Sequence, residues 1–202
     1  MQFTQKSVMK RYEAVVMGVS TGGLKALETV LRQLPGEFSL PVMIVQHRIA
    51  HSDDFLCRFL GGICQLKVME AEEKRMVKNG HVYIAPPDYH LQVEMDRTLS
   101  LSVDPPVNYS RPSVDVLFQT AAEVFQDRLV GVILTGANRD GSLGLAEIKR
   151  LGGLAVVQDP DTALAPEMPR SAIKTVSVDH VLLLEDIGRF LAQLDGSDTT
   201  TW

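Results

Sequence analysis

Short, continuous apolar runs alternate along the chain with segments in which apolar residues recur at steps of three and four. Residues 14–19 form the first run, which is typical of a strand buried on both faces. The apolar positions from Leu24 to Leu34 then follow a helical period that ends before Pro35. The same alternation predicts further strands at residues 41–45, 65–69, 81–85, 91–95, 99–103, 129–134, 154–157 and 180–184, and further helices near residues 53–60, 114–125, 144–151 and 171 and up to residue 194.

Buried strands that alternate with helices predict an α/β protein with a mostly parallel sheet that is covered on both faces. Only a short polar turn separates residues 91–95 from 99–103, and we expect these two strands to form an antiparallel hairpin at one edge of the sheet. A chain of 202 residues can bury one substantial core. We therefore expect one domain over residues 12–194, with a polar extension (1–11) before it and a polar tail (195–202) after it.

Composition narrows the classes of partner. The formal net charge is −5 and the pI is near 5.5, which argues against nucleic acid because its phosphates require a basic surface. No stretch reaches the ~20 apolar residues of a membrane span, and no signal peptide is recognisable. Cys57 and Cys64 have no metal-like spacing with histidine, so we interpret both as packed, reduced thiols of a cytoplasmic protein. No metal or other cofactor is expected.

Polar side chains follow three of the predicted strands at the point where each strand ends. Ser20 lies in a glycine-rich turn after the first strand, His47 follows the second, and Asp140 lies in the loop after residues 129–134. Because the carboxyl ends of parallel strands meet at one edge of a sheet, we expect these side chains to gather there. A hydroxyl, an imidazole and a carboxylate are the nucleophile, general base and orienting acid of a serine hydrolase.

The same residues have other interpretations. A glycine turn at a helix N-terminus also binds phosphate, but a dinucleotide site expects an acidic residue where this chain has Gln46-His47. No Gly-Lys-Ser/Thr follows the turn, which disfavours a nucleotide phosphate loop. Taken singly, His47 is compatible with a structural histidine and Asp140 with the N-cap of the helix that follows it. His51 is the nearest competing imidazole.

Seven separated motifs occur in order between about Ala14 and Leu194, and this series is far more specific than any one of its members. They are Gly18-Val19-Ser20-Thr21-Gly22-Gly23, Val45-Gln46-His47, Gly80-His81-Val82-Tyr83-Ile84-Ala85-Pro86, Arg111-Pro112-Ser113-Val114-Asp115, Gly131-Val132-Ile133-Leu134-Thr135-Gly136, Asp140-Gly141 and Met168-Pro169-Arg170. With them, the chain strongly resembles the catalytic domain of the chemotaxis protein-glutamate methylesterase family.

The resemblance implies a three-layer α/β/α sandwich with a doubly wound sheet, and hydrolysis of methyl esters on glutamate side chains of chemoreceptors. It also implies deamidation of particular receptor glutamines. By motif position Ser20 would be the nucleophile, His47 the general base and Asp140 its partner. The backbone N–H groups of Thr21 and Ala137 would bind the substrate oxyanion. The implied partners are the methylated cytoplasmic domains of chemoreceptors.

The chain departs from the family pattern in three places. The family usually joins this domain to an N-terminal receiver domain, but only about a dozen residues precede the first strand here, so we expect no phosphorylation switch within the chain and consider a separate receiver protein as a regulatory partner. The family loop Thr-Gly-Met-Gly-x-Asp-Gly has Ala137 for methionine and Asn138 for glycine, and a glycine position can demand backbone angles that only some residues accept. The Met-Pro-Pro after the histidine is Arg48-Ile49-Ala50.

Two other functions compete with this hypothesis. A regulatory or scaffold module could keep the fold after its loops had drifted, which the residues Asn138-Arg139 and the absent receiver domain would explain. An esterase for another small ester would keep the three catalytic residues and change only the substrate.

Overall fold

The computed structural model describes residues 12–48 and 54–195. The predicted extension 1–11, the loop residues 49–53 with His51, and all of the predicted tail except Asp195 lie outside the described residues. The strands are β1 (Ala14–Val19), β2 (Val42–Gln46), β3 (Lys67–Glu70), β4 (His81–Ile84), β5 (His90–Val93), β6 (Leu99–Ser102), β7 (Leu129–Ile133), β8 (Leu154–Gln158) and β9 (His180–Leu182). The helices are α1 (Gly23–Leu31), α2 (Phe55–Gly61), α3 (Val114–Phe125), α4 (Ser142–Arg150), α5 (Glu167–Thr175) and α6 (Leu184–Leu194).

Seven strands form a parallel sheet in the order β3-β4-β2-β1-β7-β8-β9. The chain builds outward from β1 in one direction and then returns to add β7 on the other side of β1. The boundary between β1 and β7 is therefore a topological switch point, where open α/β sheets place their sites. The predicted mostly parallel, doubly wound sheet is confirmed.

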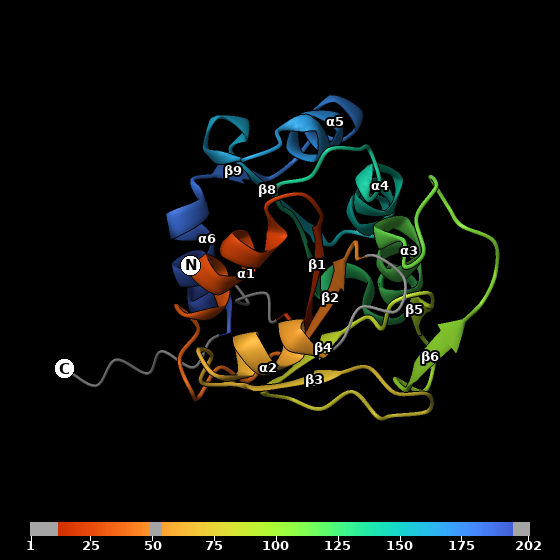
Figure 1. The fold of residues 1–202 in the computed structure, drawn as a ribbon. Coiled ribbons are helices and arrows are strands. Elements are labelled where there is room, and N and C mark those ends of the chain that lie inside the picture. Colours follow the sequence, from red (N-terminus) through yellow and green to blue (C-terminus); the bar gives the residue numbers. More distant parts are fainter. Residues whose placement is uncertain (1–11, 49–53, 196–202) are drawn as a thin grey trace, which may run out of the picture.

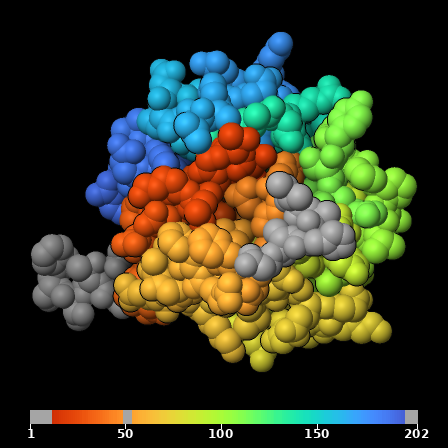
Figure 2. Space-filling view, in the orientation of Figure 1, coloured from red at the N-terminus to blue at the C-terminus, as the bar shows by residue number. Residues whose placement is uncertain are grey.

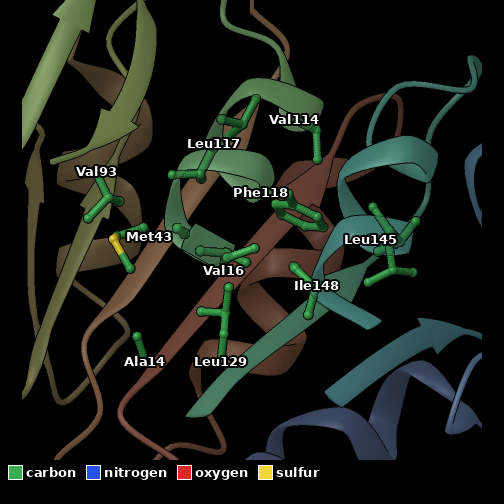
Figure 3. Close-up of a cluster of buried hydrophobic side chains, with 14 of the residues drawn as sticks. Ala14, Val16, Met43, Val93, Val114, Leu117, Phe118, Leu129, Leu145 and Ile148 are labelled. Atoms are coloured by element: carbon green, nitrogen blue, oxygen red, sulfur yellow. The ribbon is translucent and has the colours of Figure 1, made fainter. Parts of the chain in front are cut away.

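Helices cover both faces of this sheet, so the fold has three layers. Figure 1 shows α1 and α6 on one side of the strands and α3 and α4 on the other. Strand side chains alternate between the faces: Val16 packs with α3 and α4, whereas Val15 and Met17 pack with α1 and α6. Figure 3 shows the first of these two cores, where Phe118 of α3 and Ile148 of α4 lie over the sheet.

The predicted antiparallel hairpin is present, with Leu91 opposite Leu101. Its strands β5 and β6 form a two-stranded sheet of their own. Leu91 and Val93 of β5 are buried in the core beneath α3, so the hairpin extends the helical layer on that face of the large sheet. No helix among residues 12–48 and 54–195 is long and apolar enough to cross a membrane.

The two cysteines are half-buried, free thiols rather than fully buried ones. Burial, reinforced by the negative charge of Glu70, raises the pKa of Cys57 to about 11. A thiol with so high a pKa carries little thiolate at neutral pH, and thiolate is the reactive form.

We expect iodoacetamide to modify Cys57 of the native protein slowly at pH 7.5. The thiolate fraction falls tenfold for each unit by which the pKa rises, so the rate should be about 100-fold below that of the unfolded chain. A time course followed by mass spectrometry, with urea-unfolded protein as the control, measures the ratio. Equal rates in the native and unfolded protein would contradict the burial of this thiol.

Candidate active site

The candidate site lies at the carboxyl edge of the sheet, where β1, β2 and β7 end side by side. Val19 pairs with Gln46, and the His47 N–H donates to the Val19 carbonyl at 3.1 Å. On the other side of β1, the Ser20 N–H donates to the Thr135 carbonyl at 2.9 Å. Backbone pairing therefore places Ser20 between the end of β2 and the end of β7.

Two glycines shape the turn that follows Ser20. Gly22 is the N-cap of α1 and has a φ of +83°, a conformation that glycine adopts without a steric penalty. A Cβ on Gly23 would collide with the side-chain amide of Gln46. That amide donates from Nε2 to the carbonyl oxygens of Ser20, at 3.0 Å, and of His47, at 2.9 Å. Gln46 thus fixes the two strand ends relative to each other.

The structure brings His47 and Asp140 together. His47 Nε2 lies 2.8 Å from Asp140 Oδ2, the side chain of His47 is 14% exposed, and that of Asp140 is fully buried. This is the arrangement in which a carboxylate fixes the orientation and tautomer of an imidazole.

The N-terminus of α3 holds the Asp140 carboxylate. Val114 N–H donates to Oδ2 at 2.7 Å, while Asp115 N–H at 3.1 Å and Ser113 Oγ at 2.8 Å donate to Oδ1. Free N–H groups and the helix dipole both favour a negative charge at this position. Burial alone would raise the pKa of Asp140, but the hydrogen bonds from His47, Val114 and Ser113 outweigh it and lower the pKa below its ordinary value.

Asp140 is therefore a helix cap, but not for the helix that the sequence suggests. The N-cap of α4 is Gly141, and that helix has no side-chain cap. The first turn of α4 instead donates to a carboxylate of α3, because Gly144 N–H lies 2.7 Å from Asp115 Oδ1. Burial and the charge of Asp140 raise the pKa of Asp115. The two helices are thus joined by two buried carboxylates, one at each N-terminus.

A buried histidine supports the N-terminus of α3. His90 is 1% exposed; its Nδ1 accepts from the Ser113 N–H at 3.1 Å and its Nε2 faces the Pro105 carbonyl at 3.2 Å. The proton of His90 is therefore on Nε2, and Ser113 is held where its hydroxyl reaches Asp140.

The structure does not join Ser20 to His47 by a hydrogen bond. Within the described part of the chain, the Ser20 hydroxyl has no hydrogen-bond partner. His47 Nδ1 instead faces Asn138 Nδ2 at 3.3 Å. Ser20 and the β7 loop are nevertheless close, because a Cβ on Gly136 would lie 3.0 Å from the Ser20 Cβ.

Thr21 follows Ser20 in the chain, and Ala137 follows Gly136, which lies against Ser20. Neither backbone N–H, of Thr21 or of Ala137, donates a hydrogen bond to any residue in the described ranges, and both residues are exposed. The Thr135 hydroxyl donates to the Thr21 carbonyl at 2.8 Å and accepts from the Ala165 N–H at 2.9 Å. Thr135 thus holds the Thr21 peptide in place.

A pocket of about 470 Å³ opens beside Ser20, between α1 and α2. In Figure 2, α1 (orange-red) is exposed between the blue C-terminal elements and the orange α2 segment. Apolar side chains of Leu24, Phe55 and Leu56 line the pocket, and Lys25 and Arg48 add positive charge. No group of His, Cys, Asp or Glu side chains in the described ranges is arranged to hold a metal ion.

The model of the CheB methylesterase family matches residues 15–191, which include the whole site. The chain belongs to the CheB methylesterase family. The CheB methylesterase catalytic domain of Thermotoga maritima has the same fold, with a TM-score of 0.87 and 35% identity over 91% of this chain and 98% of that one.

Two relatives from other organisms carry a matching domain. A Leptospira interrogans protein, provisionally named protein-glutamate methylesterase/protein-glutamine glutaminase, is 56% identical over 91% of this chain and 95% of its own length. A Pyrococcus horikoshii protein-glutamate methylesterase/protein-glutamine glutaminase is 37% identical over 86% of this chain. The match spans only 48% of the Pyrococcus protein.

The structure shows the surroundings of two residues at which the chain departs from the family pattern, Asn138 and Arg48. Asn138 is not among the described non-glycine residues with positive φ, so the expected demand for glycine-like angles is wrong. The Arg48 side chain turns toward the ends of β3 and β4, where it donates to the Ala85 carbonyl at 2.8 Å and pairs with Glu70 at 3.2 Å. Ile49 and Ala50 lie outside the described residues.

Several residues that hold this site cannot be identified from the sequence alone. Ser113 stands out in the sequence only as part of a motif, and Gln46 only as the residue before His47, although both hold site residues through side-chain hydrogen bonds. The Arg111-Pro112-Ser113-Val114-Asp115 motif at the start of α3 was the available signal, because an N-terminal helix turn attracts an anion.

Proposed function

We propose that this protein is a serine hydrolase that removes methyl esters from glutamate side chains of chemoreceptors, with Ser20, His47 and Asp140 as the catalytic residues. The observation that carries the proposal is the 2.8 Å contact between His47 and Asp140 at the strand end next to Ser20. A buried carboxylate that is hydrogen-bonded to one nitrogen of an imidazole is the base half of a serine hydrolase.

In the proposed mechanism His47 Nδ1 takes the proton of Ser20 as its Oγ attacks the ester carbonyl. Asp140 holds the proton on Nε2 and stabilises the imidazolium that forms. The N–H groups of Thr21 and Ala137 donate to the oxyanion, and the proton passes from His47 to methanol as the C–O bond breaks. Water then attacks the acyl-enzyme with His47 again as base, which frees glutamate and Ser20.

The same steps account for deamidation of receptor glutamines, with ammonia as the leaving group in place of methanol. The names of the relatives pair a methylesterase with a glutaminase activity. The pocket beside Ser20 offers apolar walls for the methylene groups of the glutamyl ester, and Lys25 at its rim suits the acidic side chains that surround such esters. We place the reaction at the cytoplasmic domains of the receptors and include a separate receiver protein as a regulatory partner.

The occupied Nδ1 of His47 favours one alternative, a regulatory module without catalysis. The test uses three substrates: a methylated receptor cytoplasmic fragment, the same fragment without methyl esters, and p-nitrophenyl acetate. We expect the methylated receptor fragment to release methanol and the fragment without methyl esters to release none. Hydrolysis of only the small ester would identify a different esterase, and no turnover of either ester would support the regulatory module.

A further inference from the structure

Both ring nitrogens of His47 have a partner, and neither partner is Ser20. Nε2 lies 2.8 Å from Asp140 Oδ2, and Nδ1 lies 3.3 Å from Asn138 Nδ2. The orientation of the Asn138 amide follows from its other contact, because its Oδ1 accepts the Asp140 N–H at 3.1 Å. Nδ2 must then face the imidazole, and an amide nitrogen can only donate. Nδ1 is therefore the acceptor, and its lone pair is occupied.

We propose that Asn138 is a positioning residue that restrains His47 by occupying the Nδ1 lone pair, which must accept the Ser20 proton. This inference rests on the proposed function. One lone pair accepts one short hydrogen bond, so Asn138 and the Ser20 hydroxyl compete for it. The Ser20 hydroxyl, without a partner in the described part of the chain, is the group left out. Catalysis then requires the Asn138 amide to move away from the ring.

A purely structural role for Asn138 is distinct from this restraint and can be separated from it. The contact between Asn138 Oδ1 and the Asp140 N–H is a local turn that serine or aspartate also makes. The contact between Nδ2 and the imidazole needs the amide donor. Asn138→Ser therefore keeps the turn and removes the restraint. Asn138→Asp keeps the turn but replaces the donor with a carboxylate, which binds the protonated ring.

The experiment measures how fast a fluorophosphonate labels Ser20, with the modified residue identified by mass spectrometry. Asn138→Ser should label about fivefold faster than the wild type, the factor expected for loss of one competing hydrogen bond. Asn138→Asp should label more slowly than the wild type, because a doubly protonated imidazole has no lone pair for the Ser20 proton. Arg139→Ala, an exposed neighbour in the same loop, is the matched control and should label at the wild-type rate.

Nitrogen-15 NMR of the His47 ring measures the chemical shifts of its two nitrogens, which report their hydrogen bonds and not the stability of the loop. The Nδ1 resonance should shift in Asn138→Ser toward the value of a free acceptor nitrogen, while the Nε2 resonance stays that of a protonated nitrogen. If Asn138→Ser labels at the wild-type rate and its Nδ1 resonance does not shift, the proposed restraint is overturned, while the proposed nucleophile stands. Absence of Ser20 labelling in all four proteins would overturn the proposed nucleophile, and the restraint with it.

Discussion

Replacing Ser20 with alanine is expected to abolish methanol release from a methylated receptor fragment. The substitution removes the atom that forms the acyl-enzyme, and loss of the nucleophile in such a site costs on the order of 10⁴- to 10⁶-fold in turnover. The remaining N–H groups of Thr21 and Ala137 could still polarise the ester, so a small residual rate is consistent with the mechanism. Gas chromatography of released methanol measures the ratio.

The free energy of unfolding of Ser20→Ala shows whether the loss of activity comes from the missing nucleophile or from unfolding. The Ser20 hydroxyl has no partner in the described part of the chain, so the free energy of unfolding should change by less than about 0.5 kcal/mol. Ser102→Ala is the control for activity: this hydroxyl donates to Asp104 and takes no part in the site, so the variant should release methanol at the wild-type rate. Unaltered methanol release in a well-folded Ser20→Ala protein would refute the assignment of the nucleophile.

Replacing Asp140 with asparagine should remove both activity and stability. If the new amide group faces His47, it donates to Nε2 and forces the proton onto Nδ1, where no base remains; this type of change costs about 10⁴-fold. In the wild type, the Val114 N–H approaches one carboxylate oxygen of Asp140 and the Asp115 N–H approaches the other. In either orientation of the asparagine, its NH₂ group therefore faces a backbone N–H of α3. Two donors that face each other in a buried site should cost about 1–3 kcal/mol of unfolding free energy.

The pH dependence of this stability difference follows from the lowered pKa of Asp140. A carboxylate with a depressed folded-state pKa stabilises the fold above its unfolded-state pKa, and that contribution is lost as the pH falls through the folded-state value. The advantage of the wild type over Asp140→Asn should thus begin to shrink as the pH falls below about 4.

Urea unfolding at pH 7 and at pH 3, followed by circular dichroism, measures this difference. Asp179→Asn is the matched control, because Asp179 also accepts a backbone N–H, from Ala155, and pairs with Lys149 far from the site. This variant should keep full activity. A stability gap between the wild type and Asp140→Asn that was as large at pH 3 as at pH 7 would contradict the linkage.

Much of the fold could be predicted from the sequence, because continuous apolar runs and helical periods report burial directly. The run at residues 14–19 became β1, with all six residues buried. The helix predicted near residue 171 is α5, and its bounds could not be predicted because a helix end depends on local caps that apolar periodicity does not encode. The separate sheet of β5 and β6 could not be predicted, since nothing in a hairpin sequence tells which neighbouring surface it covers.

Part of the candidate site could also be predicted from the sequence, and part could not. Ser20, His47 and Asp140 could be found because strand ends in a parallel sheet share one edge. The partners of Asp140 could not be predicted, because the N-terminus of α3 precedes Asp140 by 25 to 27 residues and only packing brings the two together. The contact between Asn138 and His47 depends on a side-chain orientation that no sequence pattern specifies.

The interlocking of α3 and α4 through Asp140 and Asp115 has a consequence for how such domains change over evolutionary time. Asp140 joins two helices in addition to its proposed catalytic role, whereas the Ser20 hydroxyl makes no hydrogen bond within the described chain that the fold would lose. A copy released from selection for catalysis should therefore lose its serine early and retain its aspartate. In comparisons of this family, an intact aspartate is evidence of a preserved fold, and the serine is the better marker of a working enzyme.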